Sequence, residues 1–308
     1  MNKIGPTNAF AHAGFIGNIP HSDTYPAITP TGSELKGRSI FITGASKGIG
    51  RATAISCVKA GVSKIAIAAR SSPALQELAQ DLEAEAVKSN IPKPLILALE
   101  VDVTSKESVK AAAEKVKLGF EGVLDILVNN AGYMADMKTR IGDIDNDPDD
   151  WAKGWDVNIK GPYLCCHYLL PMLLVSELKT VINITSIGAH CVSVSGSGYN
   201  TSRFALCRFT ETLAREYEKE GLVAISLHPG TVATDMADQL PDYIQELSKN
   251  SSADKPALPA DTIVWLSKEK RDWLTGRFVF GNWDMEELKK REDDLKDNAD
   301  LLKFRLTL

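Results

Sequence analysis

The sequence predicts an α/β fold in which a doubly wound parallel sheet forms a single domain with terminal extensions. Three observations lead to this prediction. Short, almost continuously apolar segments alternate with longer segments of helical periodicity, as in sheets whose strands are covered on both faces. The alternation is repeated often, which favours parallel strands joined by right-handed crossovers. A glycine-rich turn at residues 43–50 separates the first apolar segment from the first helical one.

Seven segments have the length and apolar content of buried strands. They are residues 38–43, 64–69, 95–101, 124–129, 180–185, 223–228 and 277–280. Six segments between them have helical periodicity. They are residues 49–60, 73–89, 105–118, 151–175, 199–219 and 261–273. These elements define one domain, which we expect to cover residues 37–282.

Three segments lie outside the alternation. Residues 1–36 are interrupted by proline and glycine, and we expect this N-terminal extension to lie on the domain surface. Residues 231–260 follow the sixth strand and are interpreted as a lid. Its helical face is marked by Met236, Leu240, Tyr243, Ile244 and Leu247. Residues 283–308 are charged and amphipathic, which predicts a C-terminal extension that packs on the domain or on a second subunit.

Composition excludes several classes of partner. The chain has 308 residues, with 35 Lys and Arg against 40 Asp and Glu, for a formal charge of -5. This balance argues against nucleic acid and anionic membranes, which require a basic patch. The apolar segment 163–175 is too short to span a bilayer. Five cysteines without a C-x-x-C pair, and no secretory signal, predict reduced thiols and a cytoplasmic protein.

The glycine-rich turn predicts a Rossmann-type nucleotide site. Glycines permit a tight turn and let a pyrophosphate approach backbone N–H groups, while the following helix presents its positive end to the anion. The candidate binding residues in this turn are Gly44, Ser46, Lys47, Gly48, Ile49 and Gly50. Without its strand–helix context, such a turn would be an ordinary loop.

The end of the second strand favours NADP(H) over NAD(H). An NAD site usually places a carboxylate there to bind the adenosine ribose. This chain has Arg70 and Ser71 instead, and Lys47 adds a second positive charge nearby. A guanidinium can bind a 2′-phosphate through two hydrogen bonds. The alternative is that Arg70 is a solvated loop residue.

Several motifs together resemble those of the short-chain dehydrogenase/reductase family over residues 38–283. Thr43–Gly50 resembles its glycine turn, and Asp102-Val103 resembles the pair that contacts adenine. The run Asn129-Asn130-Ala131-Gly132 is similar to the family's NNAG, which supports the sheet beside the cofactor. Pro229-Gly230-Thr231-Val232-Ala233-Thr234 resembles the segment that holds the nicotinamide carboxamide, which implies cofactor contacts for Pro229, Gly230, Val232 and Thr234.

The resemblance also implies catalytic roles. Asn158 falls where the family keeps a catalytic asparagine, Ser186 matches its substrate-orienting serine, and Tyr199 matches its acid–base tyrosine. Ser186 alone would be a strand-end turn, and Asn158 alone a residue that caps backbone groups. The chain departs from the family at one position, because Arg203 stands where the family has lysine in Tyr-x-x-x-Lys.

Arginine can replace one function of that lysine. A phenol is a weak acid–base group at neutral pH unless a cation stabilises the phenolate, and a unit charge at ~4 Å with an effective dielectric constant of ~20 supplies about 4 kcal/mol. Tyr199 and Arg203 lie four apart, on one helix face. The lysine also binds the nicotinamide ribose and joins a proton relay, where a planar, permanently charged guanidinium differs. We therefore expect redox activity to survive at a reduced rate, or the fold to serve another reaction.

Weaker signals concern substrate, metal and assembly. Tyr133 and Met134 follow the NNAG-like run, and His190 follows Ser186, so all three are candidates for substrate contact. Asp143-x-Asp145-x-Asp147 resembles a calcium loop but lacks its glycine and glutamate, so we expect no metal. The helices at 151–175 and 199–219 resemble the family's subunit contacts, which implies a homo-oligomer, a dimer or tetramer.

These observations predict an NADP(H)-dependent oxidoreductase that interconverts a carbonyl and an alcohol on a small apolar molecule. The terminal extensions resemble those of fungal members, some of which serve secondary metabolism. Two alternatives remain because of Arg203: a non-redox step such as cyclisation or isomerisation, or a nucleotide-sensing regulator.

Overall fold

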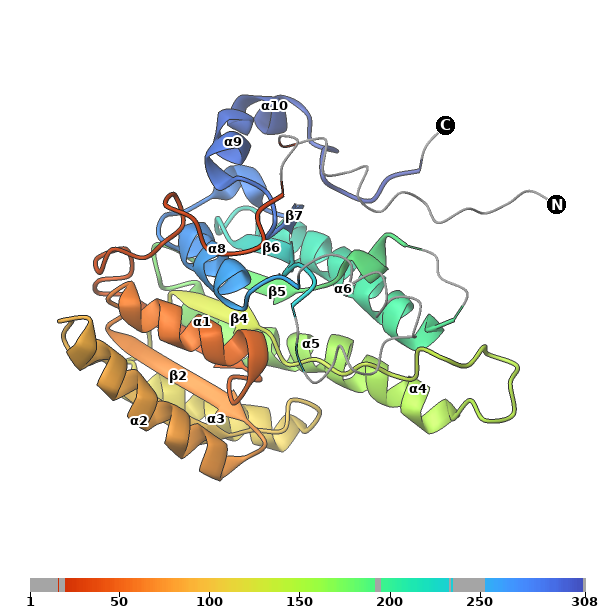
Figure 1. Ribbon diagram of the computed structural model, residues 1–308, viewed down its shortest axis with the longest axis horizontal. Coiled ribbons are helices and arrows are strands. Elements are labelled where there is room, and N and C mark those ends of the chain that lie inside the picture. The colour runs from red at the N-terminus through yellow and green to blue at the C-terminus, as the bar shows by residue number, and fades with distance from the viewer. Residues whose placement is uncertain (1–15, 17–19, 192–194, 233, 235–252, 307–308) are drawn as a thin grey trace.

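A computed structural model describes residue 16 and residues 20–191, 195–232, 234 and 253–306. Figure 1 shows a central sheet with helices on both faces. The helical face expected at residues 236–247 lies outside the described residues. No helix in the described part of the chain combines the length and apolar character needed to span a membrane.

The sheet has seven strands, all parallel, in the order β3-β2-β1-β4-β5-β6-β7. Each strand lies within one of the segments predicted from apolar content, so the predicted fold class is confirmed. The strands are β1 (Ser39–Thr43), β2 (Lys64–Ala69), β3 (Leu95–Glu100), β4 (Ile126–Asn129), β5 (Thr180–Ile184), β6 (Val223–His228) and β7 (Phe278–Phe280).

Helices cover both faces of the sheet, and each face has its own apolar core. One core joins alternate strand residues to α1 (Gly48–Lys59), α2 (Ser72–Lys88) and α8 (Ala257–Ser267). The other joins the opposite strand residues to α3 (Lys106–Gly119), α5 (Gly161–Leu173) and α6 (Ser197–Glu216). The helix predicted at 261–273 corresponds to α8, which starts earlier, at Ala257, and ends at Ser267. A short 3-10 turn follows at Asp272–Leu274.

The single helix predicted at 151–175 is interrupted. Helix α4 (Pro148–Trp155) begins after the Asp147 cap and is followed by a π-helical turn, Asp156–Lys160, and then by α5. Pro162 has no N–H to donate to the carbonyl of Asn158, so regular α-helical bonding cannot continue there. The backbone N–H of Gly161 bonds the carbonyl of Asp156, five residues back.

Both ends of the described chain pack on the sheet domain. Leu35 and Ile28, in the segment 20–36, are buried in the core beside α1 and α8. At the other end, α9 (Met285–Lys290) and α10 (Glu292–Asp297) lie at the top of Figure 1, and bury Met285 and Leu295. The C-terminal extension thus packs on its own domain.

Candidate active site

The candidate site lies at the carboxyl ends of the parallel strands. Strand order reverses between β1 and β4, which are neighbours although β2 and β3 intervene in the sequence. In doubly wound sheets, ligands bind at this switch point. The glycine turn follows β1 and the NNAG-like run follows β4, so the topology brings these two motifs together.

Direct hydrogen bonds join the glycine turn to the NNAG-like run. Asn130 donates its side-chain amide to the carbonyls of Thr43 (2.9 Å) and Gly44 (3.1 Å). The hydroxyl of Thr43 accepts the backbone N–H groups of Asn130 and Ala131, both at 3.0 Å. Gly44 has a φ of +64°, in the left-handed region that favours glycine. The turn is therefore fixed by side chains that the family resemblance had singled out.

Gly50 leaves no room for a side chain. A Cβ at this position would overlap the carbonyl oxygen of Gly44 and lie 2.5 Å from Nδ2 of Asn130. We expect Gly50→Ala to lower the free energy of unfolding by about 2 kcal/mol, because backbone cannot yield as a flexible side chain does. It should also weaken dinucleotide binding at least ~10-fold, because the turn that is predicted to bind the pyrophosphate must shift.

Gly142→Ala is the matched control, since a Cβ there meets nothing within 4 Å and the residue is exposed. Thermal unfolding and fluorescence titration with NADPH would measure both effects. Equal stability and equal affinity of the Gly50→Ala variant and the wild type would contradict the packing argument.

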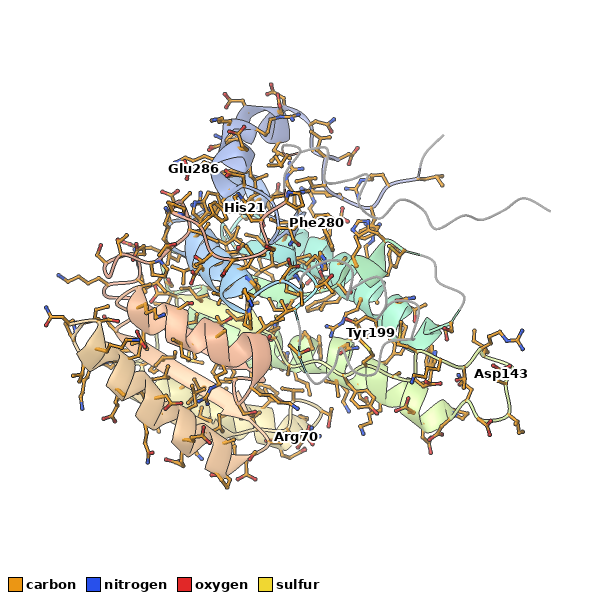
Figure 2. The ribbon with its side chains drawn as sticks, viewed as in Figure 1. His21, Arg70, Asp143, Tyr199, Phe280 and Glu286 are labelled. Carbon is orange, nitrogen blue, oxygen red and sulfur yellow. The ribbon has the colours of Figure 1, made fainter. Side chains whose placement is uncertain are left out.

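The adenosine end of the site is charged. Arg70 is exposed at the end of β2 (Figure 2), and Asp102 is exposed just after β3. The Thr104 backbone N–H (2.9 Å) and hydroxyl (2.8 Å) donate to Oδ1 of Asp102. These bonds, helped by the positive charge of Arg70, hold the pKa of the Asp102 carboxyl below its ordinary value. Arg70 and Asp102 are thus close enough to interact electrostatically.

The remaining residues predicted for this half of the site surround the turn. Lys47 is the exposed residue that precedes α1, and Ser71 is the exposed residue that precedes α2. The others are half-buried or buried near the strand ends: Ser46, Ile49, Ala131, Gly132 and Val103.

Ser186 caps a short turn after β5. Its Oγ accepts the backbone N–H of Gly188 at 3.0 Å, at the start of the 3-10 turn Ile187–Ala189. Because this bond uses a lone pair of Oγ, the hydroxyl proton remains available for another acceptor. Gly188 packs against the Tyr199 ring, since a Cβ there would lie 3.4 Å from Cε1 of that ring. The turn therefore places Ser186 beside Tyr199.

Tyr199 and Arg203 lie side by side on the buried face of α6. The two residues are 8% and 4% exposed, and the guanidinium carbon lies 5.0 Å from the centroid of the Tyr199 ring. Arg203 donates from Nη1 to the carbonyl of Ile184 at 3.0 Å, which ties it to the end of β5. Its buried Nε has no hydrogen-bond partner among the described residues. Buried polar groups are rarely left unpaired, so this donor is suited to a bound polar ligand.

Asn158 organises the neighbouring wall. The residue is fully buried, and its side chain pairs with both backbone groups of Tyr133, accepting from the N–H and donating to the carbonyl at 2.9 Å each. It also donates to Oγ of Ser202 at 2.9 Å, and Ser202 donates to the Tyr199 carbonyl at 2.8 Å. Asn158 thus connects the NNAG-like run to the helix that carries Tyr199.

The loop after β6 lies across from the glycine turn. A Cβ on Gly48 would be 3.3 Å from Cγ2 of Thr234, so these two predicted cofactor residues are in close proximity. Gly230 has a φ of +88°, and Val232 forms a bridge with Asp254. The Asp254 carboxylate accepts the Thr231 backbone N–H at 2.6 Å. Pro229 is buried at the end of β6.

The predicted substrate residues occupy different surroundings. Met134 is buried in a cluster with Met137 and Tyr199. The Tyr133 hydroxyl donates to Asp150 at 2.5 Å, and this bond raises the pKa of Tyr133 to about 12. His190 packs its ring against Phe278 and Phe304, with centroids 4.3 Å away in each case.

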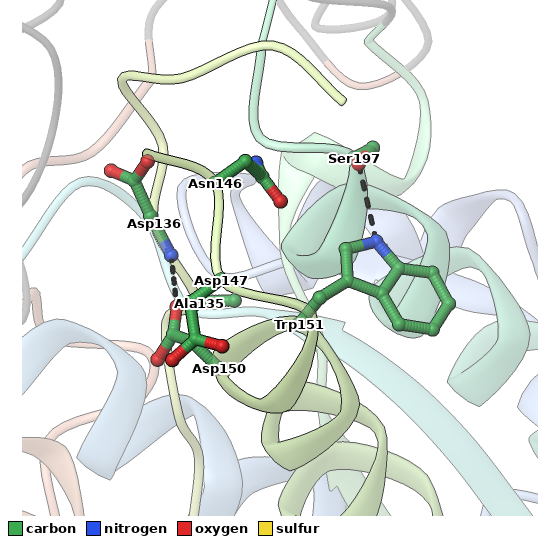
Figure 3. A pocket seen from close by; sticks show the side chains of 7 residues that line it. All are labelled: Ala135, Asp136, Asn146, Asp147, Asp150, Trp151 and Ser197. Atoms are coloured by element: carbon green, nitrogen blue, oxygen red, sulfur yellow. Dashed lines mark hydrogen bonds between the residues drawn. The ribbon is translucent and has the colours of Figure 1, made fainter. Parts of the chain in front are cut away.

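Two cavities adjoin the site. The smaller, of about 10 Å³, holds no more than a water molecule and lies between Asp136, Asp150, Trp151 and Ser197 (Figure 3). The larger, of about 1190 Å³, is bordered by His190, Asn200, Phe204 and Phe304. Ser186 and Tyr199 do not line it, so this cavity adjoins the candidate catalytic groups without containing them.

Sequence reasoning missed two residues that build the site. Ser202 joins Asn158 to Tyr199, and Asp254 holds the backbone of the loop that contains Gly230. The sequence contains a weak signal for Ser202. It is a small polar residue three positions after Tyr199, so the two side chains share one helix face. Asp254 has none, because its partner lies 23 residues away.

The fold and the site together define a Rossmann-type dinucleotide-binding protein. The residues fit such a ligand in two ways. First, Gly44 and Gly50 form a turn so tightly packed that neither position has room for a side chain, as a pyrophosphate-binding turn requires. Second, the buried Nε of Arg203 is a hydrogen-bond donor without a partner among the described residues.

Comparison with known proteins identifies the family. A model of the short chain dehydrogenase family matches residues 38–244. Short chain dehydrogenase mpl6 of Monascus purpureus is 43% identical over 94% of this chain and 95% of its own length. Short chain dehydrogenase pigC of Monascus ruber is 44% identical over 89% of this chain and 88% of its own length. The chain therefore belongs to the short-chain dehydrogenase/reductase family, whose members are oxidoreductases that bind nicotinamide cofactors and act on small molecules, and it resembles fungal members.

Solved structures agree with this fold. A short-chain type dehydrogenase/reductase from Mycobacterium marinum has a TM-score of 0.70 and 26% identity, covering 80% of this chain and 94% of that one. A 3-ketoacyl-(acyl-carrier-protein) reductase from Brucella melitensis, complexed with NADH, has a TM-score of 0.68 and 24% identity, covering 80% and 97%.

Proposed function

We propose that this protein is an NADP(H)-dependent oxidoreductase that interconverts a carbonyl and an alcohol on a small apolar molecule, with Tyr199 as the acid–base group. One observation carries the proposal. The ring of Tyr199 and the cation of Arg203 are buried together, 5.0 Å apart, beside the turn that presents the Ser186 hydroxyl. A cation beside a phenol stabilises the phenolate that remains after the phenol has given up its proton.

Each residue has a distinct role in carbonyl reduction. Ser186 donates its hydroxyl proton to the substrate oxygen, because its lone pair already accepts the Gly188 N–H. Tyr199 delivers a proton to that oxygen as negative charge develops on it, and Arg203 stabilises the resulting phenolate. The backbone carbonyl of Asn158 holds the water that resupplies the proton. This carbonyl is available because Pro162, four residues later, has no N–H to donate to it.

Residues from three strand ends and from α6 would hold the cofactor. NADPH, when bound, supplies the hydride that the reduction requires. The turn Gly44–Gly50 and the α1 N-terminus would bind the pyrophosphate, and Arg70 would bind the 2′-phosphate. Arg203 and the Pro229–Thr234 segment hold the nicotinamide end.

Absorbance at 340 nm with a panel of ketones and alcohols tests this function. NADPH oxidation that depends on a ketone, and is slower with NADH, is the expected result. Conversion of a partner molecule without cofactor consumption would contradict the redox proposal and favour an isomerisation or cyclisation.

We expect Arg203→Lys to raise NADPH-dependent turnover about fivefold, which corresponds to ~1 kcal/mol of transition-state stabilisation. A lysine ammonium rotates freely and can join a proton relay, whereas the guanidinium of Arg203 is bound to the Ile184 carbonyl. Steady-state kcat measures the change. The control is Arg208→Lys, the same replacement on the exposed face of α6, which should leave kcat unaltered. No gain in kcat with normal NADPH binding would count against the relay argument.

We also propose a cytoplasmic homo-oligomer, a dimer or tetramer. Tyr163 and Val175 at α5 and Phe204 on α6 are exposed, at 51%, 66% and 43%. These apolar side chains support subunit contacts through the two helices that the family resemblance had suggested.

A further inference from the structure

Beyond the last backbone hydrogen bond between β5 and β6, a side chain accepts the next hydrogen bond. Regular pairing ends with the backbone N–H of Thr185, which donates to the carbonyl of Leu227 at 2.8 Å. The next inward-facing N–H belongs to Ile187, and it donates to Nδ1 of His228 at 3.1 Å. The imidazole of His228 therefore binds the residue that directly follows Ser186.

His228 also fixes the start of the loop assigned to the nicotinamide. It is the last residue of β6 and directly precedes Pro229. Its carbonyl accepts the Gly281 N–H at 2.8 Å, and its ring packs edge to face against Phe280 with centroids 5.3 Å apart. Only 7% of the residue is exposed. The His228 side chain thus joins the Ser186 turn to the end of β6, where the loop that begins at Pro229 starts.

The hydrogen bond requires a neutral imidazole. Nδ1 can accept the Ile187 N–H only when its lone pair is free, which puts the ring proton on Nε2. Burial, with a smaller contribution from the charge of His190, lowers the pKa of His228 to about 3. The ring therefore stays an acceptor throughout the neutral and mildly acidic range.

We propose that His228 is a positioning residue for carbonyl reduction, which holds the Ser186 hydroxyl in register with the nicotinamide loop through the Ile187 N–H. The inference rests on the proposed function, because it assigns Ser186 the contact with the substrate oxygen. In this proposal His228 acts through the Ile187 N–H and is assigned no contact with substrate or cofactor. The loss of its acceptor should leave Ser186 misplaced and the half-buried Ile187 N–H without a partner.

Two substitutions test the hydrogen-bond acceptor of His228 and its aromatic ring independently. His228→Phe keeps an aromatic ring against Phe280 and removes the acceptor. His228→Asn keeps an acceptor near the Nδ1 position and removes the ring. We expect kcat to fall about tenfold or more in the Phe variant and at most about threefold in the Asn variant, with the NADPH dissociation constant changed less than about twofold in both. A purely packing role would give the opposite order.

Hydrogen exchange gives a readout independent of turnover. Exchange of the Ile187 amide should be accelerated in His228→Phe and remain protected in His228→Asn. If the Phe variant does not fold, His228→Asn alone still tests the inference, because protection of Ile187 with kcat near the wild-type value is then expected. A kcat below about one tenth of wild type in a folded Asn variant, despite protection, would overturn it.

A double-mutant cycle with Ser186→Ala tests the route of action. If His228 acts through Ser186, replacing it with Phe should have little further effect on kcat in the Ser186→Ala background. Multiplicative losses in kcat would overturn the inference. Full activity of Ser186→Ala would instead contradict the proposed function, whereas an impaired Ser186→Ala together with a fully active His228→Phe would contradict the role of His228 alone.

Discussion

Tyr199→Phe should reduce kcat about 1000-fold or more while NADPH still binds. The phenyl ring keeps the buried packing against Met134 and Met137, so only the hydroxyl is lost. Without it, no other acid–base group of the predicted set can deliver a proton to the substrate oxygen, and general acid catalysis typically contributes 10²–10⁴-fold. Single-turnover kinetics at 340 nm would measure the chemical step, and fluorescence titration would measure the NADPH dissociation constant.

Tyr217→Phe is the matched control, because Tyr217 lies at the C-terminal end of α6, outside the candidate site and outside the proposed subunit contacts. Its kcat should equal that of the wild type. A Tyr199→Phe variant that retained more than about a tenth of the wild-type kcat would exclude Tyr199 as the acid–base group.

Arg70→Asp should lower the ratio of kcat/KM for NADPH over NADH about 100-fold. The substitution removes a cation that can make two charge-assisted hydrogen bonds to a 2′-phosphate, a loss of about 3 kcal/mol. It also places a second carboxylate near Asp102, which repels a phosphate, while a carboxylate can accept the ribose hydroxyls of NADH. Steady-state kinetics with both cofactors measures the ratio.

The same charge reversal at Arg215, in the last turn of α6, serves as the control. Arg215 pairs with Glu218 on the surface, so Arg215→Asp should leave the cofactor ratio unchanged. If Arg70→Asp retained the wild-type ratio, Arg70 would be a solvated loop residue and the preference for NADP(H) would be withdrawn.

The strands were the most predictable part of this protein. Segments such as 64–69 and 223–228 are almost continuously apolar, because helices cover both faces of the sheet, and β2 and β6 occupy the same residues. The helix over 151–175 was less predictable. Its periodicity is continuous, but the N–H that Pro162 lacks changes the hydrogen-bonding pattern, and periodicity does not report hydrogen bonds.

The proximity of several candidate site residues was predictable from the motifs, whereas most contacts among them were not. Motifs placed Ser186, Tyr199 and Arg203 at strand and helix ends, and the structure brings these three together. The contact of Asn158 with Ser202 spans 44 residues, and it depends on how two helices are rotated against each other. The stacking of His190 on Phe304 depends on the path of the C-terminal extension, which local pattern does not encode.

The π-helical turn around Asn158 links the regularity of this helix to the geometry of the candidate site. A residue with an N–H at position 162 would let the helix close with regular bonding, and sequence optimisation for stability would favour that change. The same change would rotate Asn158 relative to Tyr133 and Ser202, which it now connects. Engineering this enzyme for heat resistance should therefore retain Pro162, since the irregular helix positions the residue that is proposed to hold the relay water.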